Sequence, residues 1–302
     1  MPEPKTQFES TRTAFLRLLL PCFAVIAILA SSAFSQQTDK KPQTASPQTL
    51  TRTTTRHEVR RLGYGSAVTI LGAPAGSITI EGWNKSEVDI TADVELHANT
   101  EEDLAQLALV NSFVVDKDAN HLRIISTGTH DKKFMKKAAK GFPKNLLGLP
   151  WKIDFRIRVP MMCDVEIDAG RGPITLSNVD GVLIVKAVES EAKLTLTGGI
   201  LMVTVAKGKV DLNIPTRSWR GRGVDMRLAV GDMTVQIPPG FSGDINADVL
   251  RTGKIENGYA GLAPREDTVA TPHSIKGRSG AGGTVLVFTV GDGTISFKGS
   301  DR

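Results

Sequence analysis

Apolar and polar residues alternate along most of the chain after residue 58, and turn residues interrupt the alternation every few positions. Between Gly170 and Val188, Ile174 and Leu176 are separated by one polar residue, and Leu183 and Val185 repeat this spacing after an Asn-Val-Asp-Gly turn. A spacing of two places successive apolar side chains on one face of a β-strand. The pattern predicts an all-β protein that is built from short strands.

The first predicted strands follow one another across short turns. They span residues 67–71, 77–80, 88–94, 112–115 and 121–125. One short helix near residues 100–108 interrupts them, because Asn99 and Thr100 can cap it and three acidic residues follow in its first turn.

After residue 150 the alternating units recur at a nearly regular distance. Ile174 and Leu194 are twenty residues apart, and so are Leu183 and Val203. One such unit cannot bury its apolar face alone, whereas units stacked about 4.8 Å apart form a continuous core. The repeat predicts a β-solenoid-like stack of short strands. Longer turns further along the chain leave a β-sandwich or meander as the alternative.

Glycine-flanked segments of this alternation resemble a known family. The segments are 76–83 followed by 88–90, then 172–181, and finally 291–297. Together they resemble the bacterial putative-adhesin domain family of β-strand repeats, a domain of unknown function, over roughly residues 60–300. The resemblance implies a β-solenoid-like fold at the cell envelope and brings no catalytic residues with it.

The N-terminal segment differs in composition from the rest. Arg12 and Arg17 precede an apolar run over residues 18–30, and Ala33-Phe34-Ser35 supplies a small-residue cleavage site. We interpret residues 1–35 as a secretory signal peptide, since the 13-residue run is shorter than the roughly 17–25 residues of a membrane-spanning helix. A retained membrane anchor is the alternative.

The remaining chain divides by composition into a linker and one long domain. Residues 36–57 are rich in Thr, Gln, Lys and Pro, which predicts a disordered linker. Residues 58–302 form the predicted β-strand-repeat domain, with a basic insertion at 130–150. Without the signal peptide, Cys163 is the one cysteine left, so the domain depends on its core and not on an internal disulfide.

Positive charge is concentrated in the basic insertion. The chain carries a net charge of +5, and between His130 and Lys144 six lysines stand against Asp131 alone. On a helix, Lys133, Lys136 and Lys137 would share one face with Lys140, which could contact anionic lipid headgroups or an acidic polymer. A solvated mobile loop is the alternative. The candidate contacts to an anionic surface are Lys132, Lys133, Lys136, Lys137, Lys140 and Lys144.

A second basic cluster combines an aromatic ring with guanidinium groups. Arg217, Trp219, Arg220 and Arg222 lie in a predicted loop, where they could stack on sugars or pair with carboxylates. Alternatively, the cluster is a turn whose Trp219 caps the stack of strands.

Signatures of catalysis and metal binding are weak. The five histidines are scattered, and none belongs to a two-histidine metal motif. Cys163 shares the apolar face of its strand with Val159 and Val165, so we predict that it packs in the core. Acidic residues at 164, 166 and 168 share the opposite face, which we interpret as solvated, and the glycine-aspartate turns never complete a calcium-binding repeat. We predict no catalytic, cofactor or metal site.

These features predict a non-enzymatic, exported cell-envelope protein that acts as an adhesin-like binding or scaffold module. It would be periplasmic, at the outer surface or extracellular, and its partner would be an anionic envelope polymer, a membrane surface or an envelope protein. Export argues against nucleic acid, although the charge alone would allow it. An accessory or sensor protein of an envelope-stress circuit and a polysaccharide-processing enzyme are the competing hypotheses.

Overall fold

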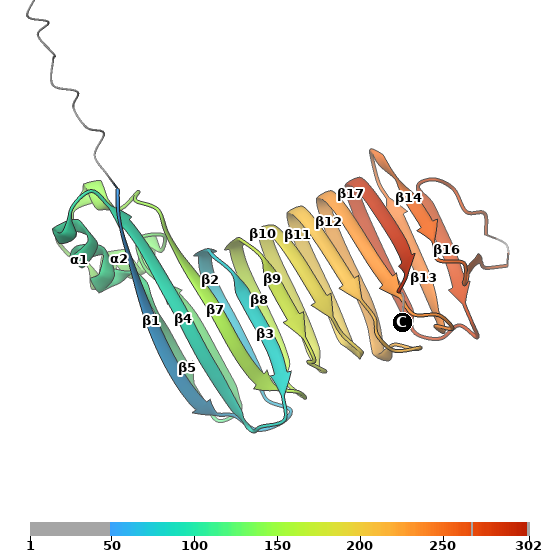
Figure 1. Ribbon diagram of the computed structural model, residues 1–302, viewed down its shortest axis with the longest axis horizontal. Helices are drawn as coiled ribbons and strands as arrows, with labels where there is room; N and C mark the ends of the chain where they lie inside the picture. The colour runs from blue at the N-terminus through green and yellow to red at the C-terminus, as the bar shows by residue number, and fades with distance from the viewer. Residues whose placement is uncertain (1–48, 267, 301–302) are drawn as a thin grey trace, which may run out of the picture. The chain divides into compact units, whose positions relative to one another are not determined.

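A computed structural model describes residues 49–300 with the exception of residue 267 (Figure 1). The predicted signal peptide and residues 36–48 of the predicted linker lie outside the described residues. Two α-helices, α1 (Glu101–Val110) and α2 (Lys132–Ala138), and the 3-10 helix η1 (Lys144–Leu146) accompany the strands of this part of the chain. The strands are β1 (Leu50–Arg61), β2 (Ala67–Ala75), β3 (Ile78–Trp83), β4 (Glu87–Ala98), β5 (Ser112–Lys117), β6 (His121–Thr127), β7 (Trp151–Pro160), β8 (Asp164–Arg171), β9 (Ile174–Ser177), β10 (Val182–Thr195), β11 (Gly198–Asn213), β12 (Arg220–Ile237), β13 (Gly243–Val249), β14 (Gly253–Gly258), β15 (Leu262–Pro264), β16 (Ser274–Ser279) and β17 (Val285–Gly299).

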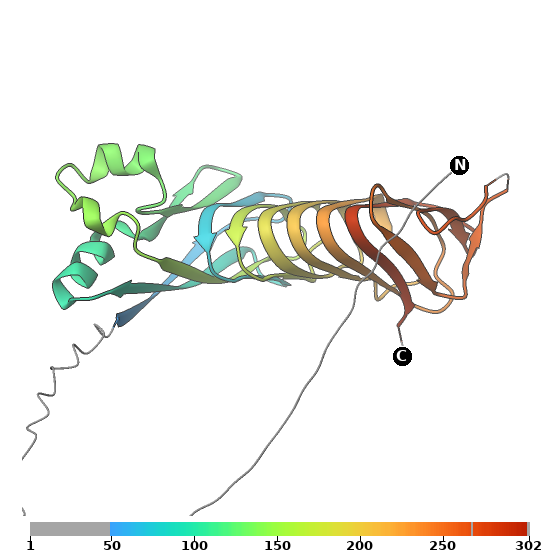
Figure 2. The same cartoon turned by 90° about the horizontal axis from the view of Figure 1, so that it is seen from above.

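The predicted all-β class with a short helix is confirmed. Hydrogen bonds join the strands of the described residues into one mixed sheet. Strands β10, β11, β12 and β17 are long, bent and parallel, and they lie side by side in sequence order (Figures 1 and 2). The finer prediction of a β-solenoid-like stack stays a prediction.

The register of the parallel strands differs from the predicted twenty-residue repeat. Leu183 pairs with Val165 and with Leu201, which are each eighteen residues away, and Leu201 then pairs with Val224, twenty-three residues further on. The eighteen-residue register differs from the predicted one by two residues, which keeps every apolar side chain on the same face, so alternation alone cannot choose between these two. Turn lengths decide the register instead.

The N-terminal strands pair with one another and with β7, β8 and β9. Strands β2 and β3 pair in parallel with β8 and β9, so residues far apart in sequence share ladders. Strand β4 lies antiparallel between β1 and β7, and β5 and β6 form an antiparallel hairpin.

Strand β1 corrects the boundary of the predicted linker. Residues 50–57 were expected to be disordered, but they pair antiparallel with β4, from Leu50 opposite Ala98 to His57 opposite Thr91. Nearly all side chains of β1 are exposed, so burial gives no sequence signal. Its threonines suit an extended backbone, and the ladder supplies the backbone hydrogen bonds.

The core lies on the inward faces of the strands. Ile174, Leu176, Leu194 and Leu196 are each at most 1% exposed, as the alternation predicted. They belong to one cluster of buried apolar side chains that continues through the stacked strands. Burial of one such side chain stabilises the fold by about 1.5–3 kcal/mol, so this core needs no disulfide.

Helix α1 confirms the predicted helix, and α2 adds a second one. The Thr100 hydroxyl accepts a hydrogen bond from the backbone N–H of Asp103, and Leu104 and Leu107 are buried beneath α1. Helix α2 lies inside the basic insertion. No helix within residues 49–266 or 268–300 is long and apolar enough to cross a membrane.

Candidate functional site: a basic groove beside helix α2

The basic insertion begins at an anchored turn. The backbone N–H of Thr129 donates to Oδ1 of Asn111 at 2.9 Å, and the Thr129 hydroxyl donates to the same oxygen at 3.3 Å. His130 is the next residue, and the centre of its ring lies 5.2 Å from the centre of the Trp151 ring. Desolvation in this position lowers the pKa of His130 below its usual value, so the ring stays neutral at neutral pH.

A capping aspartate starts helix α2. The Asp131 carboxylate accepts hydrogen bonds from the backbone N–H groups of Phe134 and Lys133, at 3.1 and 2.8 Å. These bonds lower the pKa of Asp131. Lys136 and Lys137 occupy the last turn, where positive charge interacts favourably with the helix dipole. The insertion therefore has a helical scaffold for its lysines.

The chain then turns back beside α2. An open groove of about 500 Å³ lies between α2 and the segment that follows it. Leu146 of η1 is only 1% exposed, so it attaches the segment after α2 to the core. Phe142 also packs against the core. We call this the basic groove, and it is lined by Thr129, Lys132, Met135, Lys136, Ala139, Phe142, Lys144 and Leu147.

All six predicted lysines are exposed, and three of them, Lys132, Lys136 and Lys144, line the basic groove. The ion pairs of the described residues include none of the six. Lys140 follows the end of α2, so the expectation that it shares a helical face with Lys133 is wrong. Ala139 makes the last helical bond, from its N–H to the carbonyl of Met135, and the helix ends there because Ala139 has a non-helical backbone, with φ −124° and ψ 50°.

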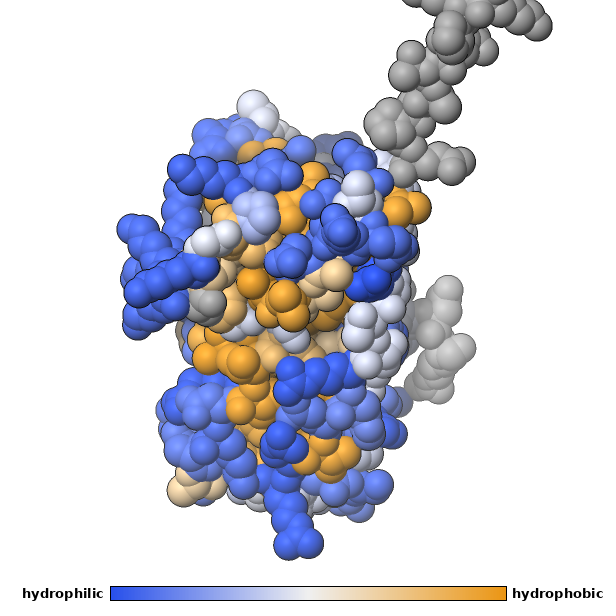
Figure 3. Space-filling view, turned by 90° about the vertical axis from the view of Figure 1, so that its left-hand side faces the viewer, coloured by the Kyte–Doolittle hydropathy of each residue, from blue (hydrophilic) through white to orange (hydrophobic). Residues whose placement is uncertain are grey.

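Apolar surface is also exposed at this end of the described chain. Figure 3 views the β1, α1 and α2 end and shows hydrophobic side chains in its centre with hydrophilic side chains around them. Leu109 of α1 is 78% exposed, and Leu147 in the basic groove is 41% exposed. The number of lysines does not indicate that apolar surface lies beside them. The positions of Met135, Phe142 and Leu147 among and after the lysines are the sequence signal for it.

The arginine cluster differs from a sugar-stacking site. Arg217, Arg220 and Arg222 are exposed. Trp219, however, is only 4% exposed and donates its indole N–H to the backbone carbonyl of Gly199 at 3.0 Å. Its assignment as a glycan contact is therefore wrong, because a buried ring cannot stack on a sugar. The three arginines remain candidates for carboxylate contacts.

The acidic face of β8 is held by the protein itself. Glu166 forms an ion pair with Lys186 at 3.0 Å, and Asp164 accepts a hydrogen bond from the N–H of Val182 at 2.8 Å. Among the residues that the structure describes, no group of three or more His, Cys, Asp or Glu side chains is arranged to hold a metal ion.

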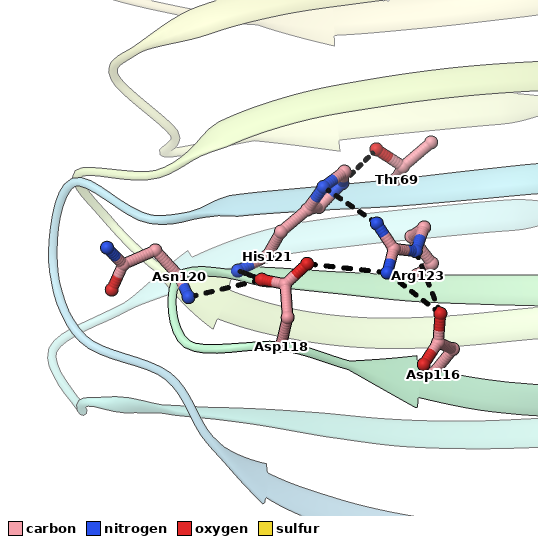
Figure 4. A network of polar contacts seen from close by, with 6 residues as sticks. All are labelled: Thr69, Asp116, Asp118, Asn120, His121 and Arg123. Atoms are coloured by element: carbon pink, nitrogen blue, oxygen red, sulfur yellow. Dashed lines mark hydrogen bonds and ion pairs between the residues drawn. The ribbon is translucent and has the colours of Figure 1, made fainter.

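A polar network on β2, β5 and β6 places a threonine hydroxyl beside a histidine ring (Figure 4), as Thr51 of β1 and His97 of β4 also do at 3.1 Å. The Thr69 Oγ1 lies 2.7 Å from Nε2 of His121, and Nδ1 of His121 faces a guanidinium nitrogen of Arg123 at 3.5 Å. A guanidinium only donates, so Nδ1 accepts and Nε2 carries the proton. His121 then donates to Thr69 and cannot remove its proton.

The rest of this network fixes the hairpin. Arg123 pairs with Asp116 at 2.8 Å and with Asp118 at 3.3 Å, and Asp118 also accepts from the backbone N–H of His121 at 3.0 Å. These contacts hold the β5–β6 turn against β2. We assign the network a structural role.

The prediction that Cys163 packs in the core is confirmed. Its side chain is 1% exposed, and burial together with the neighbouring charge of Asp164 raises the thiol pKa to about 12. A nucleophilic cysteine requires the thiolate, which is scarce at such a pKa.

Comparison with known proteins yields solved structures of low similarity. No protein-family model matches the chain, and no curated protein matches it. A putative cell adhesion protein from Clostridium sporogenes is 14% identical, with a TM-score of 0.43 over 82% of this chain and 100% of that one. A putative adhesin from Bacteroides fragilis is 14% identical, with a TM-score of 0.32 over 81% and 97%. A putative adhesin from Parabacteroides merdae is 10% identical, with a TM-score of 0.18 over 80% and 95%. Because these TM-scores are below 0.5, the function proposed below rests on this chain's own residues.

Proposed function

We propose that this chain is a non-enzymatic, exported protein of the bacterial cell envelope, an adhesin-like binding or scaffold module that docks on anionic membrane surfaces through the basic groove. The observation that carries the proposal is a set of lysines without an ion pair among the described residues, beside apolar side chains in the same groove. Lys132, Lys136 and Lys144 line the same groove as Phe142 and Leu147.

The charge of the groove favours an anionic partner. A lysine that already forms an ion pair gains little from a second anion, because the first pair must weaken. The six lysines of the insertion have no such pair among the described residues, so their charge is available to a partner. Each lysine near an anionic bilayer contributes about 1 kcal/mol of binding free energy.

The apolar lining favours a lipid over a fully polar polymer. Met135, Phe142 and Leu147 offer surface that the glycerol and upper acyl region of a lipid can cover, whereas a hydrated polyanion would leave this surface in water. Helix α2 is too short to act alone as an interfacial helix, but the anchored return through Leu146 gives it a defined orientation.

Vesicle binding tests the proposal. The full chain and its variants are sedimented with phosphatidylcholine vesicles, with and without phosphatidylglycerol. The N-terminal apolar run is the same in all variants, so it cancels from the comparison. We expect the triple variant Lys132→Ala, Lys136→Ala, Lys144→Ala to lose about 3 kcal/mol of binding, which is roughly a hundredfold in partition coefficient, on phosphatidylglycerol vesicles only.

A matched variant separates a specific groove from general positive charge. Lys117, Lys276 and Arg61 are exposed cations outside the basic groove that take part in none of the ion pairs of the described residues, and their replacement by alanine removes the same net charge. The double variant Met135→Ser, Leu147→Ser tests the apolar side chains of the groove and should also weaken binding. Equal losses for the groove triple and the matched triple, or equal binding of wild type to both kinds of vesicle, would contradict the proposal.

A further inference from the structure

A second candidate site lies on the outward face of the long parallel strands β10, β11, β12 and β17. Because these strands pair in register, outward side chains at equivalent positions form continuous rows. One row contains Thr195, Asn213, Gln236 and Lys298, which pair successively across the four strands. The neighbouring row, two residues earlier on each strand, contains Lys193, Asp211 and Ser296, together with Thr234, which is only 9% exposed. We call these two rows the ladder face.

The ladder face is held rigid by the core directly beneath it. Between the two rows lie Leu194, Leu212, Val235 and Phe297, each at most 1% exposed. Adjacent strands are about 4.8 Å apart, so hydrogen-bonding groups recur at that interval in one direction. A preorganised polar array binds a ligand with little loss of side-chain or backbone entropy.

The rows border a shallow groove of about 360 Å³. Three lysines, Lys193, Lys209 and Lys298, line it together with one acid, Asp211. Lys209 pairs with Asp211 at 3.1 Å, which neutralises that acid. Lys193 and Lys298 take part in none of the ion pairs of the described residues. The groove is therefore cationic.

One arginine, Arg220, extends the same surface beyond the end of β10. Thr197 continues the outward row two residues beyond Thr195, because Leu196 between them is buried. The guanidinium of Arg220 donates to the Thr197 hydroxyl at 2.8 Å. The end of the row thus carries a planar cation, and a guanidinium matches the geometry of a carboxylate.

We propose that the ladder face binds an acidic polysaccharide, a polymer of carboxylated sugars that lies across the four strands. Asn213, Gln236 and Thr195 exchange hydrogen bonds with sugar hydroxyls, and Lys193, Lys298 and Arg220 pair with the carboxylates. The residues lining the groove include no exposed aromatic or large apolar side chain, which argues against a protein partner. This site shares no residue with the basic groove and does not depend on the function proposed for it.

Binding of labelled polymers to the full chain tests the proposal. Polygalacturonate and alginate are the probes. Fully methyl-esterified polygalacturonate keeps most hydroxyls but lacks the charge, and polyphosphate of matched charge lacks the sugars. We expect both probes to bind and both controls to bind at least about tenfold more weakly. Failure of both probes to bind would overturn the proposal. Equally tight binding of polyphosphate would also overturn it, since the surface would then be a general anion exchanger.

Paired variants locate the binding. Lys193→Ala with Lys298→Ala, and Asn213→Ala with Gln236→Ala, should each weaken polygalacturonate binding by at least about tenfold. Lys117→Ala with Lys276→Ala, and Thr204→Ala with Thr289→Ala, make comparable changes away from the ladder face and should leave polygalacturonate binding unchanged. The groove triple variant should keep full polysaccharide binding, and the ladder variants should keep vesicle binding. Equal losses in the ladder and matched variants would overturn the site.

Discussion

Gly231 stacks on Gly208 so closely that a Cβ atom on Gly231 would lie 1.8 Å from the backbone oxygen of Gly208. Both glycines adopt a positive φ, +133° and +135°. The contact repeats at the same bend of the next strands, where a Cβ on Gly293 would lie 1.8 Å from the oxygen of Gly231. Glycine is therefore required at these bends for two reasons, the backbone conformation and the close approach of the next strand.

Replacement of Gly208 by alanine should destabilise the protein strongly. The new Cβ would lie 2.0 Å from the carbonyl oxygen of Ser190 and would adopt a disfavoured φ, so the ladder between β10 and β11 must shift. We expect a loss of at least about 3 kcal/mol in the free energy of unfolding, measured by urea denaturation. Gly63→Ala is the control, because no atom lies within 4 Å of its Cβ position. Similar losses for the two variants would contradict this explanation.

Ser190 occupies the same bend and offers the opposite test. It is 3% exposed, and its hydroxyl has no hydrogen-bond partner within the described residues. A buried unsatisfied hydroxyl costs roughly 1–3 kcal/mol. Ser190→Ala should therefore leave the unfolding free energy unchanged or raise it by about 1 kcal/mol. A clear loss of stability would mean that a buried water satisfies the hydroxyl.

The sequence predicted which way the side chains point, but not which residues pair across neighbouring strands. Alternation predicted that Ile174 and Leu194 point inward, and both do, because burial and side-chain period are local properties. It could not predict that Leu194 pairs with Leu176, since a two-residue slip leaves the facing unchanged. The ladder face depends on register, so no local sequence signal could reveal it.

The candidate site was predictable in charge but not in shape. The run of lysines identified the insertion, and Asp131 followed by helix formers was a usable signal for α2. The apolar side chains of the groove are brought together only because the segment after α2 buries Leu146 in the core. This is a tertiary contact, which local sequence does not reveal. Trp219 was misassigned because a tryptophan between arginines has the same sequence signature whether it packs inward or outward.

Acid should destabilise the protein in part through Asp292. Hydrogen bonds from Arg251 at 2.9 Å and from the Thr252 hydroxyl at 2.8 Å lower the pKa of Asp292 to about 2. The ordinary aspartate pKa is near 3.8. Since the folded state holds this carboxylate ionised more strongly than the unfolded state does, its stabilisation is complete above pH 4 and is lost as the pH falls toward 2.

The pH dependence of the Tm measures this contribution. Asp292→Asn should flatten the fall in Tm between pH 4 and pH 2 relative to wild type. Asp168→Asn is the control, because Asp168 is exposed and has no ion pair among the described residues. An unchanged slope in Asp292→Asn, or the same flattening in both variants, would show that the contacts with Arg251 contribute nothing measurable.

Arg56 should matter for stability more than its exposed position in β1 suggests. Its guanidinium lies 4.5 Å from the centre of the Phe113 ring and donates to the Phe113 carbonyl at 2.7 Å, so it joins β1 to β5. We expect Arg56→Ala to lower the unfolding free energy by about 1–2 kcal/mol and to speed hydrogen exchange in β1. Arg61→Ala removes an equally charged, exposed side chain without these contacts and should have little effect. Fast hydrogen exchange of residues 50–57 in the wild type would instead support the prediction that these residues belong to a disordered linker.

Cys163 should resist modification in the folded protein for two separate reasons. Its side chain is buried, and with a pKa of about 12 only about one molecule in ten thousand carries a thiolate at pH 8. In the full chain with Cys22→Ser, a thiol-specific disulfide reagent should therefore label Cys163 only after denaturant unfolds the protein. Met162→Cys combined with Cys163→Ser moves the thiol by one residue to a position that is 63% exposed, and this variant should react at once. Rapid native labelling of Cys163 would mean that the inward face of β8 opens to solvent.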